Sequence, residues 1–282
     1  MNRSLIMAVF LLVVGNNIVI FSDSLIKLLD GFDAPFQFVF YRQVSAALIL
    51  LPFIVFFKRP LLPRRLRWHA TRAHIFLLGT VFMVVSLTTL PLATANAIFY
   101  AAPIITVVLA RLLFKERVTR LSLVTAVLGM TGVLVIINPA SANIFALAAL
   151  VVATTLALNN LLIKKLPSEH GIIDTLYLTN LLGIPVAACL TWFEGASFNL
   201  DTLLIAVGSS LFSMIYAGTC VFAYRAAESN KITSAEYTGL IGAVVLGMLF
   251  FTETPDVRFY VGSVLIIVPL TVLTLRNSKS VG

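Results

Sequence analysis

Two tyrosines at equivalent positions of an internal repeat are the first candidates for binding chemistry. Tyr100 and Tyr237 lie 137 positions apart, and the same shift relates much of the apolar sequence that follows each of them. A tyrosine ring can stack on a planar group, and its hydroxyl can form hydrogen bonds. Single tyrosines in apolar helices usually pack or anchor at the membrane interface. A tyrosine from each half at equal depth nevertheless predicts a site for a planar organic molecule.

Other polar and aromatic side chains within apolar segments are candidates for the same substrate site. They are Asn17, Asn96, Phe99, Asn160 and Tyr216. The 137-residue shift maps Ser22-Asp23 onto Asn159-Asn160, so we expect Asn16, Asn17, Ser22 and Asp23 to meet Asn159 and Asn160 near a pseudo-two-fold axis. These groups would line a cavity or hold helices together, at about 0.5–1.5 kcal/mol per hydrogen bond. We favour helix packing for Asn159 and ligand contact for Asn17.

Three charged residues, Asp23, Arg42 and Glu236, are candidate proton or charge sites because charges inside apolar segments are costly. Glu236 could bind an amine-bearing substrate or carry a proton. It could equally be a carboxylate favoured by a helix start or paired with a nearby cation. Arg42 could hold an anionic substrate group, but we favour a structural role, either at the outer interface or paired with Asp23 or Asp33.

The composition is that of a membrane protein. Of 282 residues, 60% are hydrophobic and only 11% are charged, and the mean hydropathy is +1.02. A soluble chain of this length would need more polar surface. The net charge of +8 comes from basic residues in short breaks between apolar runs, a placement typical of topology signals and not of nucleic-acid binding.

Signals for enzyme chemistry are missing from the sequence. There is no glycine-rich phosphate loop followed by Lys and Ser or Thr, and His69, His74 and His170 do not have metal-ligand spacing. Cys189 and Cys220 both lie in apolar runs and are interpreted as packing residues. We therefore predict no metal, no cofactor and no enzymatic activity.

Ten apolar segments approach the roughly 20 residues needed to cross a bilayer as helices. They are residues 4–29, 36–57, 73–90, 92–113, 120–137, 143–165, 171–193, 201–225, 232–251 and 259–275. With the N-terminus in the cytoplasm, seventeen of the twenty Lys and Arg residues fall on the cytoplasmic side, and the outer loops hold only Lys27 and Arg258. Both termini are then cytoplasmic.

The repeat divides the chain into residues 1–138 and 139–282, each with five predicted spans. Because five is odd, the second unit must enter the membrane from the opposite side. The basic break KERVTR after the fourth span has the counterpart TETPDVR after the ninth, which has lost most of the positive charge. Inverted repeats of this kind place a binding site near the membrane midplane and transport by alternating access. Glycines such as Gly129 and Gly132 are expected to mark close helix packing within the chain.

These features resemble the drug/metabolite transporter superfamily, in the branch built from two EamA-type repeats. The resemblance covers essentially the whole chain and is carried by FVFYRQVSAALILLP, by PLATANAIFYAAPIITVVLARLLFKE and by EYTGLIGAVVLGMLFFTETPDVRFYVGSVLIIVP. It implies a carrier whose central cavity is lined by helices of both halves. Similar carriers take S-adenosylmethionine or riboflavin, and other branches export amino acids, purines or drugs. The S-adenosylmethionine-carrier-like pattern has a basic residue at the position of Glu236.

The sequence therefore predicts an all-α integral membrane protein of ten helices in two inverted EamA-like repeats. We expect a secondary-active transporter of a small organic metabolite in a bacterial inner membrane, with a planar or amine-bearing substrate. Membrane lipid is the other expected partner, and the oligomeric state is left open. The alternatives are a proton-coupled exporter of amino acids, purines or drugs and, from another class, a membrane scaffold or enzyme.

Overall fold

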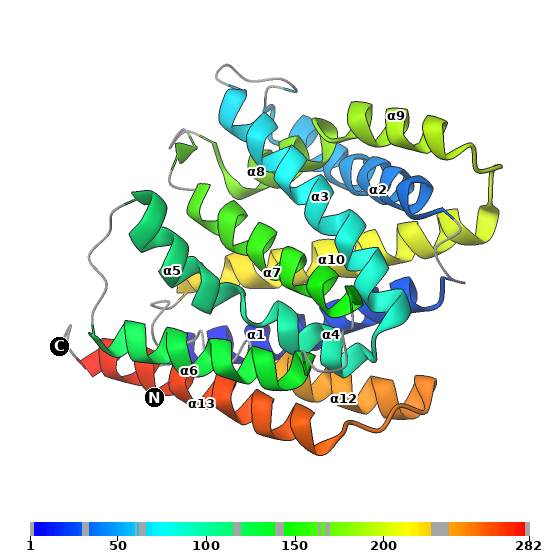
Figure 1. Cartoon of the computed structure of the whole chain (residues 1–282). Coiled ribbons are helices and arrows are strands. Elements are labelled where there is room, and N and C mark those ends of the chain that lie inside the picture. The colour runs from blue at the N-terminus through cyan, green and yellow to red at the C-terminus, as the bar shows by residue number, and fades with distance from the viewer. Residues whose placement is uncertain are drawn as a thin grey trace.

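The computed structural model describes residues 3–29, 34–59, 61, 66–114, 120–138, 144–162, 165–166, 170–226 and 237–279, and these residues contain helices and no strand. The helices are α1 (Arg3–Lys27), α2 (Pro35–Phe56), α3 (Arg67–Thr89), α4 (Leu92–Phe99), α5 (Ala102–Phe114), α6 (Arg120–Ile137), α7 (Ile144–Leu162), α8 (Ile172–Leu181), α9 (Ile184–Glu194), α10 (Leu200–Ala226), α12 (Thr238–Phe251) and α13 (Val257–Lys279). Figure 1 shows them as one bundle.

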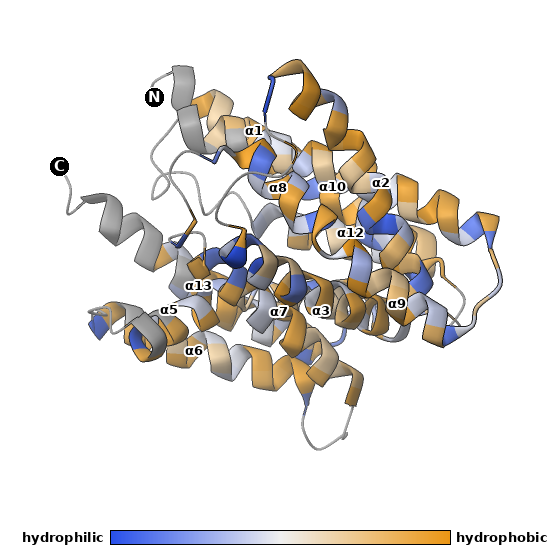
Figure 2. Cartoon of the chain, turned by 90° about the horizontal axis from the view of Figure 1, so that it is seen from above, coloured by the Kyte–Doolittle hydropathy of each residue, from blue (hydrophilic) through white to orange (hydrophobic). Residues whose placement is uncertain are grey.

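Several helical segments are long and apolar enough to cross a membrane. In the described part of the chain, seven segments satisfy the criteria of length and hydropathy, and three shorter apolar helices add to them. The shorter ones are Leu123–Ile137, Thr238–Phe251 and Val257–Pro269. Hydrophobic residues predominate along the helices in Figure 2. The protein is thus an all-α, multi-pass membrane protein, and the count of ten spans stays a prediction.

Two of the predicted spans are each made of two helices. Residues 92–113 divide into α4 and α5 at Tyr100-Ala101, and residues 171–193 divide into α8 and α9 at Leu182-Gly183. Pro103 and Pro185 lie just beyond these breaks, and each lacks the N–H that would bond to the carbonyl four residues earlier. The first break places Tyr100 between α4 and α5.

The long helix pairs each join an early helix to a late one. α1 packs along α10, α3 along α7 and α6 along α13, while α2 contacts α8 and α9, and α4 contacts α12 (Figure 1). As predicted, glycines mark close approaches within the chain. A Cβ on Gly129 would overlap Ile104, and one on Gly132 would come within 2.6 Å of the carbonyl oxygen of Gly262.

Candidate functional site

Tyr100 and Tyr237 are in contact. Tyr100 follows the last residue of α4, and Tyr237 directly precedes α12, so the α4–α12 contact brings the two rings together. Their centroids are 5.8 Å apart, and the rings meet edge to face at 61°. Tyr237 is buried and Tyr100 is half-buried. An edge-to-face pair is a stable aromatic arrangement, and tyrosine ring faces can stack on planar groups.

α1 forms the next wall of this site because two glycines let it approach α12. A Cβ on Gly239 would overlap the hydroxyl of Tyr100 and come within 2.9 Å of the carbonyl oxygen of Asn16. A Cβ on Gly242 would overlap the amide oxygen of Asn17. Asn16 and Asn17 are therefore directed at α12, which places Asn17 one helix turn from the tyrosine pair.

A buried polar network begins one turn further along α1. Ser22 Oγ lies 2.7 Å from Ser209 Oγ and 3.0 Å from Ser213 Oγ on α10. Arg42 of α2 donates from Nη2 to Ser213 Oγ over 3.0 Å, and Ser210 Oγ donates to the Arg42 carbonyl over 2.9 Å. The network joins the first and second halves of the chain at a buried arginine.

Asp23 is buried beside this network and interacts electrostatically with Arg42. A side-chain hydrogen bond links it to Asn96 of α4. Its Oδ1 atom accepts no hydrogen bond from the described residues, and the described residues give Asp23 no ion pair within 4.0 Å. Arg42 is itself buried. Of the alternatives considered for Arg42, its burial beside Asp23 favours the pairing with Asp23 over a position at the outer interface, and both stay predictions.

Asn159 and Asn160 do not join these groups, contrary to expectation. They lie on α7, which packs along α3, whereas α1 packs along α10. Asn159 is buried and its carbonyl accepts a 3.3 Å hydrogen bond from Arg72 Nε, while Asn160 is exposed. Helices related by the repeat need not touch each other, and α1 and α7 pack on α10 and α3 and not on each other.

The remaining predicted residues are distributed as follows. Phe99 is buried in the apolar core beside Tyr100. Tyr216 is half-buried on α10, where its ring would lie 3.5 Å from a Cβ on Gly15 of α1. Glu236 lies outside the described residues. The structure thus places Asn17, Asn96, Tyr100 and Tyr237 around α1, α4 and α12, with Tyr216 on the neighbouring α10.

An ion pair that sequence reasoning missed lies at the end of the bundle predicted to face outward. Lys27 Nζ is 2.8 Å from Glu253 Oε1, and it donates to the Leu90 carbonyl over 2.6 Å. Glu253 Oε2 accepts a 2.7 Å hydrogen bond from the Leu92 backbone N–H at the start of α4. The available signal was that Lys27 is one of two outward-loop cations and that Glu253 repeats Glu116.

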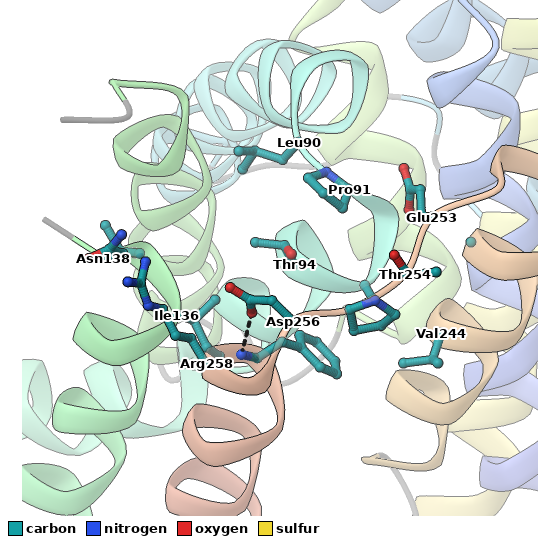
Figure 3. Close-up of a pocket in the computed structure, with 15 residues that line it drawn as sticks. Leu90, Pro91, Thr94, Ile136, Asn138, Val244, Glu253, Thr254, Asp256 and Arg258 are labelled. Atoms are coloured by element: carbon teal, nitrogen blue, oxygen red, sulfur yellow. Dashed lines mark hydrogen bonds between the residues drawn. The ribbon is translucent and has the colours of Figure 1, made fainter. Parts of the chain in front are cut away.

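Beside this ion pair is a cavity of about 310 Å³ between α4, α6, α12 and α13. Figure 3 shows Glu253, Thr254 and Asp256 along one side and Pro91 and Thr94 along another. Asp256 Oδ1 accepts a 2.8 Å hydrogen bond from the backbone N–H of Phe259 and so caps α13. Glu253 therefore lines the cavity while its carboxylate also contacts Lys27 and the start of α4.

Comparison with known proteins identifies the family. A sequence model of the EamA-like transporter family matches residues 6–138 and again residues 143–275. The chain belongs to the EamA-like transporter family. The two matches also show that it is built from two EamA-like repeats, within the drug/metabolite transporter superfamily.

Relatives of this EamA-like protein are transporters and not enzymes. It is 25% identical to an S-adenosylmethionine uptake transporter of Rickettsia prowazekii over 86% of this chain and 84% of the relative, and 27% identical to one of Rickettsia conorii over the same shares. It is 26% identical to the pseudopaline exporter CntI of Pseudomonas aeruginosa over 67% of this chain and 68% of the exporter.

A solved structure has the same fold. It is titled only as the crystal structure of a protein, covers 99% of both chains and superposes with a TM-score of 0.62 at 14% identity. At that identity the likeness concerns the fold alone.

Proposed function

We propose that this EamA-like protein moves a small planar or amine-bearing organic metabolite across a bacterial inner membrane by alternating access, with both termini in the cytoplasm. The observation that carries the proposal is the Tyr100–Tyr237 pair, one ring from each repeat in direct contact. Asn17 and Asn96 add hydrogen-bonding groups from α1 and α4. Together they offer π faces and amides, which suit a heteroaromatic ring.

The depth of the tyrosine pair supports a central substrate site. Tyr100 lies nine residues after Pro91, where α4 begins at the end of the bundle. At a rise of about 1.5 Å per residue this is about 13 Å along the helix. A hydrocarbon core is about 30 Å thick, so the pair lies near its middle.

The helix pairing supports two inverted repeats as the moving parts. Under the 137-residue shift α1 corresponds to α7, and α3 to α10. The contact of α1 with α10 therefore has α7 with α3 as its counterpart, and α6 pairs with its own counterpart α13. A pseudo-two-fold axis between the halves produces this pattern. With five predicted spans in each half, that axis would lie in the membrane plane and would allow one half to rock against the other around a fixed site.

S-adenosylmethionine is the substrate to test first, because the two Rickettsia relatives are named as its uptake transporters. It has a planar adenine, a cationic sulfonium and a primary amine. Tyrosine faces attract both planar rings and cations, by about 0.5–2 kcal/mol per contact. The tyrosine pair and the asparagines thus match the ring and the cationic groups of this substrate.

The test is uptake of labelled S-adenosylmethionine by proteoliposomes. We expect Tyr237→Ala to raise the half-saturating concentration by about tenfold, because a loss of about 1.4 kcal/mol of binding is tenfold. Tyr260→Ala is the matched control, since Tyr260 is an exposed tyrosine on α13. Wild-type kinetics in a folded Tyr237→Ala protein would contradict the proposed site. No uptake of any planar or amine-bearing metabolite by the wild type would contradict the proposed function.

A proton-coupled exporter is the second candidate, and the burial of Asp23 favours it. Asp23 is 3% exposed and has an oxygen without a donor among the described residues. A carboxylate inside the membrane marks a proton relay in many transporters. Flux driven by an imposed pH gradient that is lost in Asp23→Asn would support this function. Flux that ignores the gradient in the wild type and in both Asp23→Asn and Glu236→Gln would exclude it.

A further inference from the structure

We infer that Glu253 is a cation-binding group at the mouth of the transport path, held by Lys27 when the path is closed and taken by the amine of an entering substrate. The inference rests on the proposed function and adds a second site to it, separate from the tyrosine pair. The site lies at the end of the bundle predicted to face outward. Its ligand is a primary ammonium group.

Lys27 ties together three parts of the bundle. It is the last residue of α1, and its ammonium contacts Glu253 after α12 and the carbonyls of Leu87 and Leu90 at the end of α3, at 2.8, 3.4 and 2.6 Å respectively. It also lies 5.5 Å from the ring centre of Phe251. The ammonium has three donors, and these contacts use them. α1 and α3 of the first repeat are thereby fastened to the end of α12 in the second.

Separating Glu253 from Lys27 is energetically unfavourable unless another cation takes the place of Lys27. Its side chain is 14% exposed, and Lys27 is 13% exposed. Breaking a mostly buried ion pair by removing one partner leaves an uncompensated charge, which is strongly unfavourable. Glu253 Oε2 would keep the Leu92 N–H, but Oε1 would lose its only described partner. A second ammonium that replaces Lys27 removes this cost.

The cavity in Figure 3 provides the route by which that ammonium can arrive. Glu253 lines it together with Thr94 and Thr254, whose hydroxyl oxygens can accept further hydrogen bonds from an ammonium. Asp256 lines it too, but one of its oxygens caps α13. About 310 Å³ admits a ligand part of several heavy atoms. Glu253 is therefore the carboxylate that has Lys27 on one side and an open cavity on the other.

The same face of α1 links this ion pair to the tyrosine pair. Lys27, Asp23, Ile20 and Asn16 follow one another at intervals of three or four residues, so they lie on one side of the helix. Asp23 forms a side-chain hydrogen bond with Asn96 of α4. Towards α12, Ile20 would lie 3.6 Å from a Cβ on Gly242, and the carbonyl oxygen of Asn16 would lie 2.9 Å from a Cβ on Gly239. Release of Lys27 would loosen the seam between α1 and α12 that leads inward to the tyrosines.

Thiol labelling from outside measures this release. Ile20→Cys is the reporter, because Ile20 is fully buried on the α1–α12 seam. It is placed in the full chain with Cys189 and Cys220 replaced by serine, in reconstituted vesicles of known orientation. The reagent is the anionic, membrane-impermeant 2-sulfonatoethyl methanethiosulfonate. Lys27→Met and Glu253→Gln should each raise the labelling rate about fivefold or more. This is the size of effect expected when two sites in a protein are energetically coupled. Arg59→Met is the matched control, since it removes an ion-pair cation from the other end of the bundle.

The ligand class is tested by the effect of added compounds on the labelling rate of Ile20→Cys, with Lys27 and Glu253 both unchanged. External S-adenosylmethionine should raise labelling, and 5′-deoxy-5′-dimethylsulfonioadenosine, which keeps the ring and the sulfonium but lacks the amine, should leave it unchanged. Glu253→Gln should remove the difference between the two compounds. An unchanged labelling rate in Lys27→Met would overturn the inference that the Lys27–Glu253 pair holds the path closed. Equal responses to the two compounds, or no response to either, would overturn the inference that Glu253 binds the substrate amine. Uptake measured in the same vesicles separates this from a failure of the proposed function, which would show as absent transport by the wild type.

Discussion

Tyr100 places its hydroxyl directly against Gly239, at a point where a methyl group would overlap the tyrosine oxygen. The carbonyl oxygen of Asn16 lies within 2.9 Å of the same methyl position. Glycine at this position therefore sets how closely α4, α1 and α12 approach one another. The geometry of the tyrosine pair depends on that close approach.

Gly239→Ala should reduce transport by about tenfold, because forcing a methyl group into a packed site costs about 1–3 kcal/mol and the tyrosine must move to relieve it. The helix itself gains up to about 1 kcal/mol in propensity from alanine, so folding should survive. Gly218→Ala on α10 is the control, since nothing lies within 4 Å of its added carbon. Uptake assays on both variants decide the matter, and equal rates would show that the tyrosine position is not critical.

The tyrosine contact was open to prediction because the repeat itself singled out both residues. A constant shift made Tyr100 and Tyr237 equivalent, and a site between the halves requires a residue from each. The Lys27–Glu253 pair was not predictable in this way. Both residues are visible as charges at the ends of apolar runs, but no periodicity says which helix ends meet. The packing of α1, α3 and α12 decides that.

Removing the positive charge of Arg42 should destabilise the protein by about 1–3 kcal/mol, because Ser213 loses a charged donor and the buried Asp23 loses a neighbouring charge. Asp23→Asn in the Arg42→Met background should restore a large part of that loss. The measurement is a double-mutant cycle on thermal or denaturant unfolding in detergent. A coupling energy of at least about 1 kcal/mol is expected for groups in one network. Strictly additive effects would show that the two charges do not act together.

The polar groups of α1 illustrate a different limit of the sequence. Ser22 was paired with Asn159 by the repeat shift, yet its partners are Ser209 and Ser213 on α10. Repeat symmetry relates residues that have equivalent surroundings, and it does not bring them together unless they lie on the axis. Short serine hydroxyls on α10 also gave no signal beyond that of many helix-packing serines. Only the helix contacts could assign these bonds.

Glu194→Ala should lower the stability of the protein by about 1–2 kcal/mol, because Glu194 caps α2 from another helix. Its two carboxylate oxygens accept hydrogen bonds from the backbone N–H groups of Phe36 and Gln37, at 3.0 and 2.8 Å. Glu194→Gln keeps one acceptor and should lose less. Thermal unfolding of the two variants gives the comparison. An alanine variant as stable as the wild type would mean that water accepts the hydrogen bonds of the first α2 N–H groups equally well.

Gly262→Ala should destabilise the pair of α6 and α13 by about 1–3 kcal/mol, although alanine is the better helix residue. The added carbon would come within 2.6 Å of the carbonyl oxygen of Gly132 and would overlap Ile136. A backbone carbonyl cannot move aside as the end of a side chain can, so the helices must separate and lose packing that membrane helices depend on. Gly218→Ala again provides the control because it adds the same carbon in open space. Thermal unfolding in detergent should show a lower midpoint for Gly262→Ala alone. Equal midpoints would mean that α6 and α13 do not approach at these glycines in the folded protein.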